Sequence, residues 1–153
     1  MRRQFILAIY LEQSTRKDAR LLELWRLLDD QDDFNFQATM TADEQDVKEM
    51  ISDNLFLTFD ESGQPIGFIG FYTYYDRKRR YGVRIYIIPE QRRRGYGPQL
   101  VDMLRLLAIE KHYSQIFAVV CKDNNRSSRL FERDLNWRLD HQTDRKTYFS
   151  CRP

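Results

Sequence analysis

The stretch "IIPEQRRRGYGPQL" at residues 87–100 joins two kinds of secondary structure through three arginines and two glycines. The apolar run at residues 83–89 predicts a strand, which Pro89 and Glu90 close, and from Pro98 onward the apolar residues recur with helical spacing. Proline is tolerated in the first turn of a helix, because the N–H that it lacks has no partner there. The sequence therefore predicts a strand, a tight loop and the start of a helix.

This loop has the features of an anion site. The first N–H groups of a helix have no partner within the helix, and the helix dipole is positive at that end. Gly95 and Gly97 place no side chain where an anion must approach the main chain, while Arg92, Arg93 and Arg94 can add charge-assisted hydrogen bonds. The arrangement favours a bound phosphate or pyrophosphate over the alternative, a solvated basic turn that binds nothing.

The elements on either side of this loop indicate a mixed sheet. Leu100, Leu104, Leu107 and Ala108 lie on one face of the helix after Pro98, and the apolar run "SQIFAVV" then predicts another strand. Two strands joined by a crossover helix are parallel. The other predicted elements are a strand at residues 5–11, helices at 17–28 and 42–51, a hairpin turning at 60–65, a basic turn at 76–82, a short helix after Asn124, and closing strands in "WRLD" and "KTYFSC".

The predicted order is thus β-α-α-β-β-β-α-β-α-β-β, an α/β (α+β) fold with a central mixed sheet and helices on its faces. A length of 153 residues without repeats or a linker predicts a single domain over residues 1–153. Basic residues precede the apolar start, as in a signal peptide, but the run is short and no small-residue cleavage site follows, so a buried strand is favoured. No stretch reaches the length of a membrane span.

Charge and cysteine content exclude some classes of protein. A net charge of +2 says little about nucleic acid or membranes. Cys121 and Cys151 form no C-x-x-C pair and are typical of a reducing compartment, so a cytoplasmic location is expected. The chain has only two histidines, and no metal site is expected. The sequence does not fix the oligomeric state and leaves a homodimer open.

Two segments resemble the GNAT N-acetyltransferase superfamily. "IYIIPEQRRRGYG" is similar to its acetyl-CoA signature, with Arg92, Gly95 and Gly97 in register, and "VCKDNNRSSRLFERDLNW" is similar to its second signature. In that second segment the matching positions are Asn124, Ser127, Leu130 and Phe131, and Leu135, Asn136 and Trp137 stand for its "L-G-F" close. The element order also resembles that of the family, so the resemblance covers nearly the whole chain.

The resemblance implies an acyltransferase that uses acetyl-CoA as acyl donor, with strands four and five, residues 83–88 and 115–120, splayed in a V around the cofactor. It implies that Arg92, Arg93, Arg94, Gly95, Tyr96 and Gly97 hold the pyrophosphate. Main-chain groups of Ile85, Tyr86, Ile87 and Ile88 would pair with the pantetheine arm, as in an added strand. Asn124, Ser127 and the face of Phe131 would line the arm near its thiol end.

The chain departs from the family at the catalytic positions. The tyrosine that usually protonates the leaving thiolate is replaced by Phe131, and Val119 stands where some relatives have a glutamate base. Holding the amine and the thioester together supplies roughly 7 to 11 kcal/mol by itself, so direct attack remains feasible. Water, Tyr86 or Cys121 are the remaining candidates for proton transfer. For Cys121 the plain buried thiol is the alternative.

The acceptor is expected to be an amine of a small molecule or a protein. The segment at residues 29–46 is acidic and contains no lysine or arginine, so it either attracts a cationic acceptor or is solvated surface. Polyamine-like molecules, aminosugars and protein amines fit the first alternative. The residues expected to contact the acceptor are Asp29, Asp30, Asp32 and Asp33, with Phe34 and Phe36 as an apolar wall.

Two other functions stay open at this stage. Without the tyrosine, the fold can serve as a binding module for a protein partner that catalyses little or nothing. The basic cluster at residues 77–80 allows an RNA-directed or tRNA-directed acetyltransferase, although a solvated turn is favoured. No membrane partner is expected.

Overall fold

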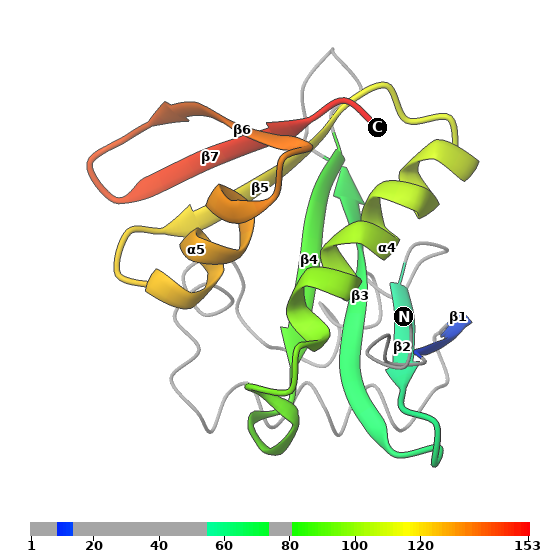
Figure 1. Cartoon of the computed structure of the whole chain (residues 1–153). Coiled ribbons are helices and arrows are strands. Elements are labelled where there is room, and N and C mark those ends of the chain that lie inside the picture. Colours follow the sequence, from blue (N-terminus) through cyan, green and yellow to red (C-terminus); the bar gives the residue numbers. More distant parts are fainter. Residues whose placement is uncertain (1–8, 14–54, 74–80) are drawn as a thin grey trace, which may run out of the picture.

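The computed structural model describes residues 9–13, 55–73 and 81–153 (Figure 1). The predicted helices at 17–28 and 42–51 and the basic cluster at 77–80 lie outside these ranges. The strands are β1 (Tyr10–Gln13), β2 (Leu55–Phe59), β3 (Pro65–Thr73), β4 (Tyr81–Ile87), β5 (Ile116–Cys121), β6 (Trp137–Gln142) and β7 (Lys146–Cys151). The helices are a short 3-10 turn η2 (Pro89–Gln91), α4 (Tyr96–Glu110) and α5 (Asn125–Arg133).

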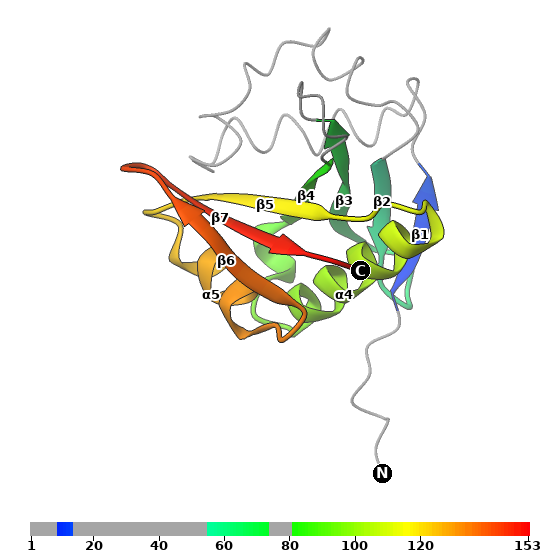
Figure 2. The ribbon, with the colours of Figure 1, turned by 90° about the horizontal axis from the view of Figure 1, so that it is seen from above.

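The strands form one mixed sheet in the order β1-β2-β3-β4-β5-β7-β6. Strands β1 to β4 pair antiparallel with their neighbours, β4 and β5 are parallel across the α4 crossover, and β5, β7 and β6 are again antiparallel. Helices α4 and α5 lie on the same face of the sheet (Figure 2). The predicted α/β mixed sheet and the parallel crossover are confirmed.

Strands β4 and β5 separate soon after they meet. Their register contains only Tyr81 with Ile116 and Gly82 with Phe117, although β4 continues to Ile87 and β5 to Cys121. Figure 1 shows the two strands diverging toward the N-terminus of α4 and toward α5. The sheet is therefore open along the facing edges of β4 and β5, as the family resemblance implies.

The hairpin between β2 and β3 forms as predicted, because Asp60 organises its turn. The Asp60 carboxylate accepts hydrogen bonds from the Ser62 amide and hydroxyl and from the Gln64 amide, at 2.7 to 2.9 Å. These hydrogen bonds lower the pKa of the Asp60 carboxyl group. Gly63 follows with a φ of 81°, a left-handed conformation that glycine adopts without steric cost.

Helix α4 packs an apolar stripe against the sheet. Leu100, Leu104 and Ala108 are completely buried and Leu107 is partly buried, as its spacing predicts. The helix begins at Tyr96, two residues earlier than expected, because left-handed Gly95 is its N-cap and Pro98 is its third residue. In the α5 layer, Phe131 packs edge-on against Trp137 at 4.8 Å and stacks with Phe149 at 5.7 Å between ring centroids.

Three strand boundaries differ from the prediction. The first strand was expected at residues 5–11, but β1 runs to Gln13, because its pairing with β2 continues as far as Gln13 opposite Phe56. Residues 5–8 lie outside the described ranges. Strand β4 starts at Tyr81 and ends before Pro89, where η2 turns the chain, and β5 extends to Cys121. Within the described residues, no helix has the length and apolar character to cross a membrane.

Candidate active site

A cavity of about 300 Å³ lies in the opening between β4 and β5. Its walls come from β3, from β4, from the loop and first turn of α4, from the middle of β5, and from α5. The lining residues are Tyr72, Val83, Arg84, Ile85, Tyr86, Ile87, Gln91, Arg92, Arg93, Gly95, Tyr96, Gly97, Pro98, Ala118, Val119, Val120, Asn124, Arg126, Ser127, Leu130 and Phe131. The structure thus brings both GNAT-like segments to one cavity.

The loop before α4 turns its main chain toward this cavity. Arg93 has a φ of 64° and Gly95 a φ of 83°, so two residues close together are left-handed. Turns that alternate between right-handed and left-handed backbone make concave sites of N–H groups that bind anions. The Gly95 cap also has no side chain that could accept a hydrogen bond from the first amides of α4. These amides are therefore available to an anionic ligand.

The three arginines of the loop occupy different positions. The Arg92 Nε donates a hydrogen bond of 2.8 Å to the Ile87 carbonyl, and its guanidinium lies 5.7 Å from the centre of the Tyr86 ring. Arg93 lines the cavity with an exposed side chain. Arg94 is exposed and does not belong to the lining. Arg92 therefore holds the loop to the end of β4, in addition to any contact with a ligand.

The edge of β4 offers main-chain groups to the cavity at alternate residues only. The Ile88 amide donates to the Ile66 carbonyl at 2.8 Å, so Ile88 points toward β3. Main-chain groups of successive strand residues point to opposite edges. Those of Ile85 and Ile87 therefore point into the opening, and those of Tyr86 do not. Within the span 85–88 that is expected to pair with the cofactor, the main chains of Tyr86 and Ile88 thus face β3, and Ile88 does not line the cavity.

Gly97 lies where the first turn of α4 comes close to α5. A Cβ atom at this position would lie 3.1 Å from Cδ1 of Leu130 and 3.9 Å from Cδ1 of Ile87. The expected approach of a pyrophosphate to the main chain is one reason for a glycine at this position. The structure adds a second reason, because the missing side chain lets Leu130 pack against the first turn of α4.

Asn124 caps α5 at the cavity wall, as predicted. Its side-chain oxygen accepts a hydrogen bond from the Ser127 amide at 3.2 Å, and both residues line the cavity. Phe131 also lines the cavity, with only 2% of its surface exposed. Since Trp137 and Phe149 hold its ring, the wall at this point is rigid and apolar.

The two predicted proton-transfer residues are placed differently. Tyr86 is buried, packs 5.5 Å from Phe68 and lines the cavity. Cys121 is the last residue of β5 and is not part of the lining, because the cavity reaches β5 only at residues 118–120. The predicted acceptor residues Asp29, Asp30, Asp32, Asp33, Phe34 and Phe36 lie outside the described ranges.

Sequence reasoning missed Tyr72 and Arg84. The Arg84 guanidinium carbon lies 4.2 Å from the centre of the Tyr72 ring, and both side chains line the cavity. A signal was present, since an arginine in the apolar strand "YGVRIYI" requires a polar surrounding or a ligand. Period-two alternation would have placed Arg84 on the same face as Tyr86.

A splayed mixed sheet, an arginine-glycine loop at a helix N-terminus and an asparagine-capped helix together define a cleft of the acetyltransferase type. In agreement, the family model "Acetyltransferase (GNAT) family" matches residues 21–137. The chain belongs to this family. No curated protein matches the chain in sequence.

Solved structures share the fold at low sequence identity. A GNAT superfamily phosphinothricin acetyltransferase from Sinorhizobium meliloti, in complex with AcCoA, has a TM-score of 0.76 and 17% identity, covering 94% of this chain and 88% of that one. A GNAT-family acetyltransferase from Bacillus anthracis has a TM-score of 0.73 and 16% identity, with 94% of each chain covered. Mutant forms of a spermidine/spermine N-acetyltransferase from Vibrio cholerae have a TM-score of 0.72 and 16% identity, covering 94% of this chain and 93% of that one.

Proposed function

We propose that this protein transfers an acetyl group from acetyl-CoA to a primary amine. One observation carries the proposal: a single cavity joins the open N-terminus of α4, the main-chain edge of β4 that β5 does not pair with beyond Gly82, and the asparagine cap of α5. These are the groups that an acyl-CoA needs, namely N–H donors for its phosphates and a strand edge for its amide-rich arm. A structural neighbour named as a phosphinothricin acetyltransferase was solved with AcCoA, and another is named as a spermidine/spermine N-acetyltransferase.

The residues of the cavity can each be given a role in holding the donor. The amides around Arg93 and Gly95 bind the pyrophosphate, and the exposed guanidinium of Arg93 adds a charge-assisted hydrogen bond. Ile85 offers its N–H and C=O to the pantetheine arm. Ile87 offers its N–H, since Arg92 already bonds its carbonyl. Asn124, Ser127 and Phe131 form the opposite wall.

Acetyl-CoA supplies an activated thioester. In the transfer, the amine nitrogen forms a bond to the acyl carbon, the carbon–sulfur bond breaks, the amine loses a proton and the thiolate gains one. Phe131 has no proton to give, so the protein contributes chiefly by holding the two reactants in contact and excluding water. Of the two predicted proton-transfer residues, Tyr86 lines the cavity and Cys121 does not. We therefore assign proton transfer to the Tyr86 hydroxyl or to a bound water.

The first experiment tests donor binding. Gly95→Val places a β-branched residue in a left-handed conformation, which strains the N-cap by about 1 to 3 kcal/mol. Gly63→Val is the matched control, because Gly63 has nearly the same φ, sits in the β2–β3 turn and has open space around it. Calorimetric titration of the wild type with acetyl-CoA is expected to give 1:1 binding. Gly95→Val should lose at least about tenfold in affinity, while Gly63→Val keeps it. No binding of any acyl-CoA to the wild type would contradict the proposal.

A second candidate, a binding module without catalytic activity, is favoured by the apolar wall at Phe131. Phe131→Tyr separates the two functions. If thiolate departure limits the rate, a hydroxyl at this position should maintain or raise the release of CoA with an amine acceptor. Release from neither form, over a panel of amines and peptides, would favour the module.

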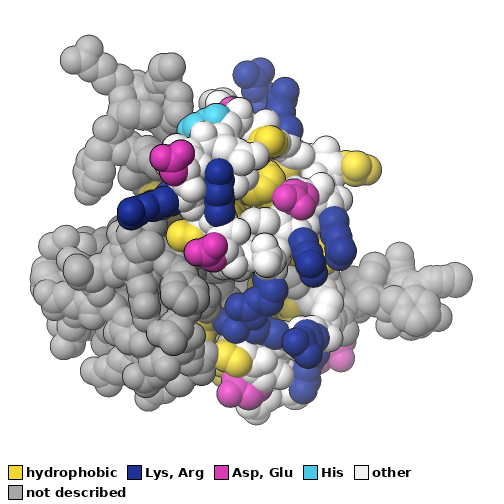
Figure 3. Space-filling model, turned by 90° about the vertical axis from the view of Figure 1, so that its left-hand side faces the viewer, with side chains coloured by type: hydrophobic (Ala, Val, Ile, Leu, Met, Phe, Trp, Pro, Cys, Tyr) yellow, Lys and Arg dark blue, Asp and Glu magenta, His cyan; other side chains and the backbone are white. Residues whose placement is uncertain are grey.

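The RNA-directed alternative rests on residues 77–80, which are outside the described ranges. On the side of the molecule that carries α5 and the β6–β7 hairpin, cationic side chains are interspersed with acidic ones rather than gathered in a stripe (Figure 3). This surface gives no support to a polyanionic partner.

A further inference from the structure

The cavity carries more positive charge than one anionic group requires. Of the described residues that line it, none is acidic and four are arginines, namely Arg84, Arg92, Arg93 and Arg126. Arg84 belongs to β4, Arg92 bonds the Ile87 carbonyl, and Arg93 is proposed to hold the pyrophosphate. Arg126, in the first turn of α5, serves none of these purposes. An excess of cations in one cavity favours a ligand with more than one anionic group.

Arg126 stands at the wide end of the opening between β4 and β5. The two strands part after Gly82 and Phe117, and each then turns into a helix, β4 into α4 and β5 into α5. The N-termini of α4 and α5 therefore both lie at the wide end (Figure 1). Arg93 comes from the loop before α4 and Arg126 from α5, so their side chains reach the cavity from different walls.

The Arg126 side chain is not used to hold the fold together. It is exposed, and within the described part of the chain its guanidinium makes no hydrogen bond or ion pair. Arg105 on α4 is different, because it bonds Asp102. A positive charge in the first turn of a helix opposes the helix dipole, and α5 has no acidic residue there to compensate. Arg126 thus destabilises α5 slightly unless an anion is bound beside it.

Coenzyme A has two separate anionic groups. The pyrophosphate joins the pantetheine arm to the adenosine, and a further phosphate is attached to the 3′ oxygen of the ribose. A phosphate monoester of this kind carries a charge of about −1.5 to −2 at pH 7. With the arm along β4 and the pyrophosphate at the loop before α4, the adenosine and its 3′-phosphate lie at the wide end, on the side of Arg126.

We propose that Arg126 binds the 3′-phosphate of the donor, so that the protein selects coenzyme A over forms of the cofactor that lack this phosphate. The inference rests on the proposed function, in which acetyl-CoA is the donor, and adds a residue that determines donor specificity. A guanidinium donates two parallel hydrogen bonds to phosphate oxygens, which a lysine cannot do. Pantetheine presented on a carrier protein, without adenosine, would leave Arg126 unused.

The test compares acetyl-CoA with acetyl-3′-dephospho-CoA, which differs only in the missing phosphate. In calorimetric titrations, the wild type should bind acetyl-CoA at least about tenfold more tightly than the dephospho form. Arg126→Met should weaken binding of acetyl-CoA to the level of the dephospho form and change binding of the dephospho form by less than about twofold. Arg129→Met is the matched control, because it removes an exposed arginine of the same helix outside the cavity lining, and it should retain the preference.

Two further variants and one melting experiment separate this role from others. Arg93→Met should weaken both ligands by similar factors, because both contain the pyrophosphate. Arg126→Lys keeps the charge but not the planar pair of donors, and should retain only part of the preference. Without ligand, the Tm of Arg126→Met should equal or slightly exceed that of the wild type, since a positive charge leaves the N-terminus of α5. A structural role for Arg126 would lower the Tm instead.

Equal binding of the two donors by the wild type, or a folded Arg126→Met protein that keeps the preference, would overturn the inference and leave the proposed acetyl transfer intact. Loss of both donors by the same factor in Arg126→Met would also overturn it, because Arg126 would then hold the pyrophosphate. Failure of the wild type to bind any acyl-CoA would refute the proposed function and the inference with it. Binding needs no acceptor, so the comparison is valid whether or not the acetyl group is transferred.

Discussion

Arg92 and Arg93 are identical neighbours in sequence, yet the fold gives them different tasks. Arg92 turns back and bonds the Ile87 carbonyl, which fixes where β4 ends. Arg93 adopts a left-handed backbone, which is uncommon for a residue with a side chain and orients the adjacent amides. The sequence predicts that this positively charged loop binds an anion, but it does not predict which arginine holds the loop to β4. That distinction depends on a side-chain direction.

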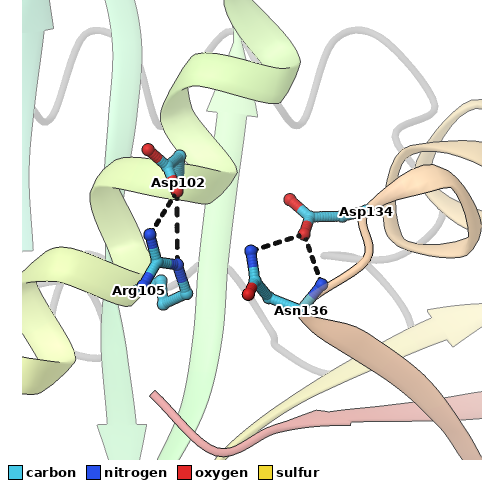
Figure 4. Close-up of polar contacts among 4 residues, drawn as sticks. All are labelled: Asp102, Arg105, Asp134 and Asn136. Carbon is cyan, nitrogen blue, oxygen red and sulfur yellow. Dashed lines mark hydrogen bonds and ion pairs between the residues drawn. The ribbon is translucent and has the colours of Figure 1, made fainter.

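Cys151 gives a prediction at the scale of one residue. It is 1% exposed at the end of β7, and burial is the main cause that raises its pKa from 9.0 to about 11. The positive charge of Arg105 lowers this pKa and the negative charge of Asp134 raises it. Figure 4 shows that Arg105 donates hydrogen bonds to Asp102 on α4, and that Asp134 accepts hydrogen bonds from Asn136 in the turn before β6. Between pH 9 and 11 the native thiol keeps a proton that the unfolded thiol has lost, so its contribution lowers the free energy of unfolding as pH rises.

At pH 8, ionisation alone should make Cys151 react with iodoacetamide about a hundredfold more slowly in the native protein than in urea. Peptide mass spectrometry after timed labelling measures this directly, and the difference in unfolding free energy between wild type and Cys151→Ala should fall from pH 9 to 11. Rapid labelling of the native thiol at pH 8 would show that the end of β7 opens readily.

At the scale of the element, β4 serves two functions by alternation. The main-chain groups of Ile85 and Ile87 point into the opening between β4 and β5. The side chains of Arg84 and Tyr86 lie on the face of the sheet that points away from α4 and α5. Recognising an apolar strand from its composition was sufficient to predict this element. Its dual use was not predicted, because that requires knowing that the neighbouring strand separates after two residue pairs.

The alternation predicts a pattern of amide exchange along β4. The Ile85 amide, which faces the opening, should exchange at least about tenfold faster than the Tyr86 amide, which faces β3. Saturating acetyl-CoA should slow exchange at Ile85 and leave Tyr86 unchanged. Exchange measured by NMR with and without the ligand provides the comparison, and Gly95→Val at the same ligand concentration is the control. Equal protection of both amides in the free protein would mean that the edge of β4 is covered.

At the scale of the molecule, local patterns predicted the element types and the long-range arrangement supplied the site. Leu100, Leu104 and Ala108 identify α4, and Asp60 with Gly63 identifies the hairpin, because these signals lie within a few residues of one another. The place of β7 between β5 and β6 and the position of Arg84 at the cavity depend on pairings between distant segments. Such pairings are decided by packing, which a single sequence does not display.

The divided sheet leads to a last prediction about the stability of the whole molecule. Strands β1 to β4 and strands β5 to β7 are joined in the sheet by two residue pairs, and the cavity lies between the two groups. A donor bound there contacts both groups and binds only the native state.

At a concentration of 100 times Kd, acetyl-CoA should raise the free energy of unfolding by about 2.7 kcal/mol. For a domain of this size, that corresponds to a rise in Tm of about 5 to 11 °C. Differential scanning calorimetry measures the shift, and Gly63→Val should show the same increment as wild type while Gly95→Val shows little. A shift of equal size in Gly95→Val would place the ligand away from the loop, because the distorted N-cap could not then be part of its site.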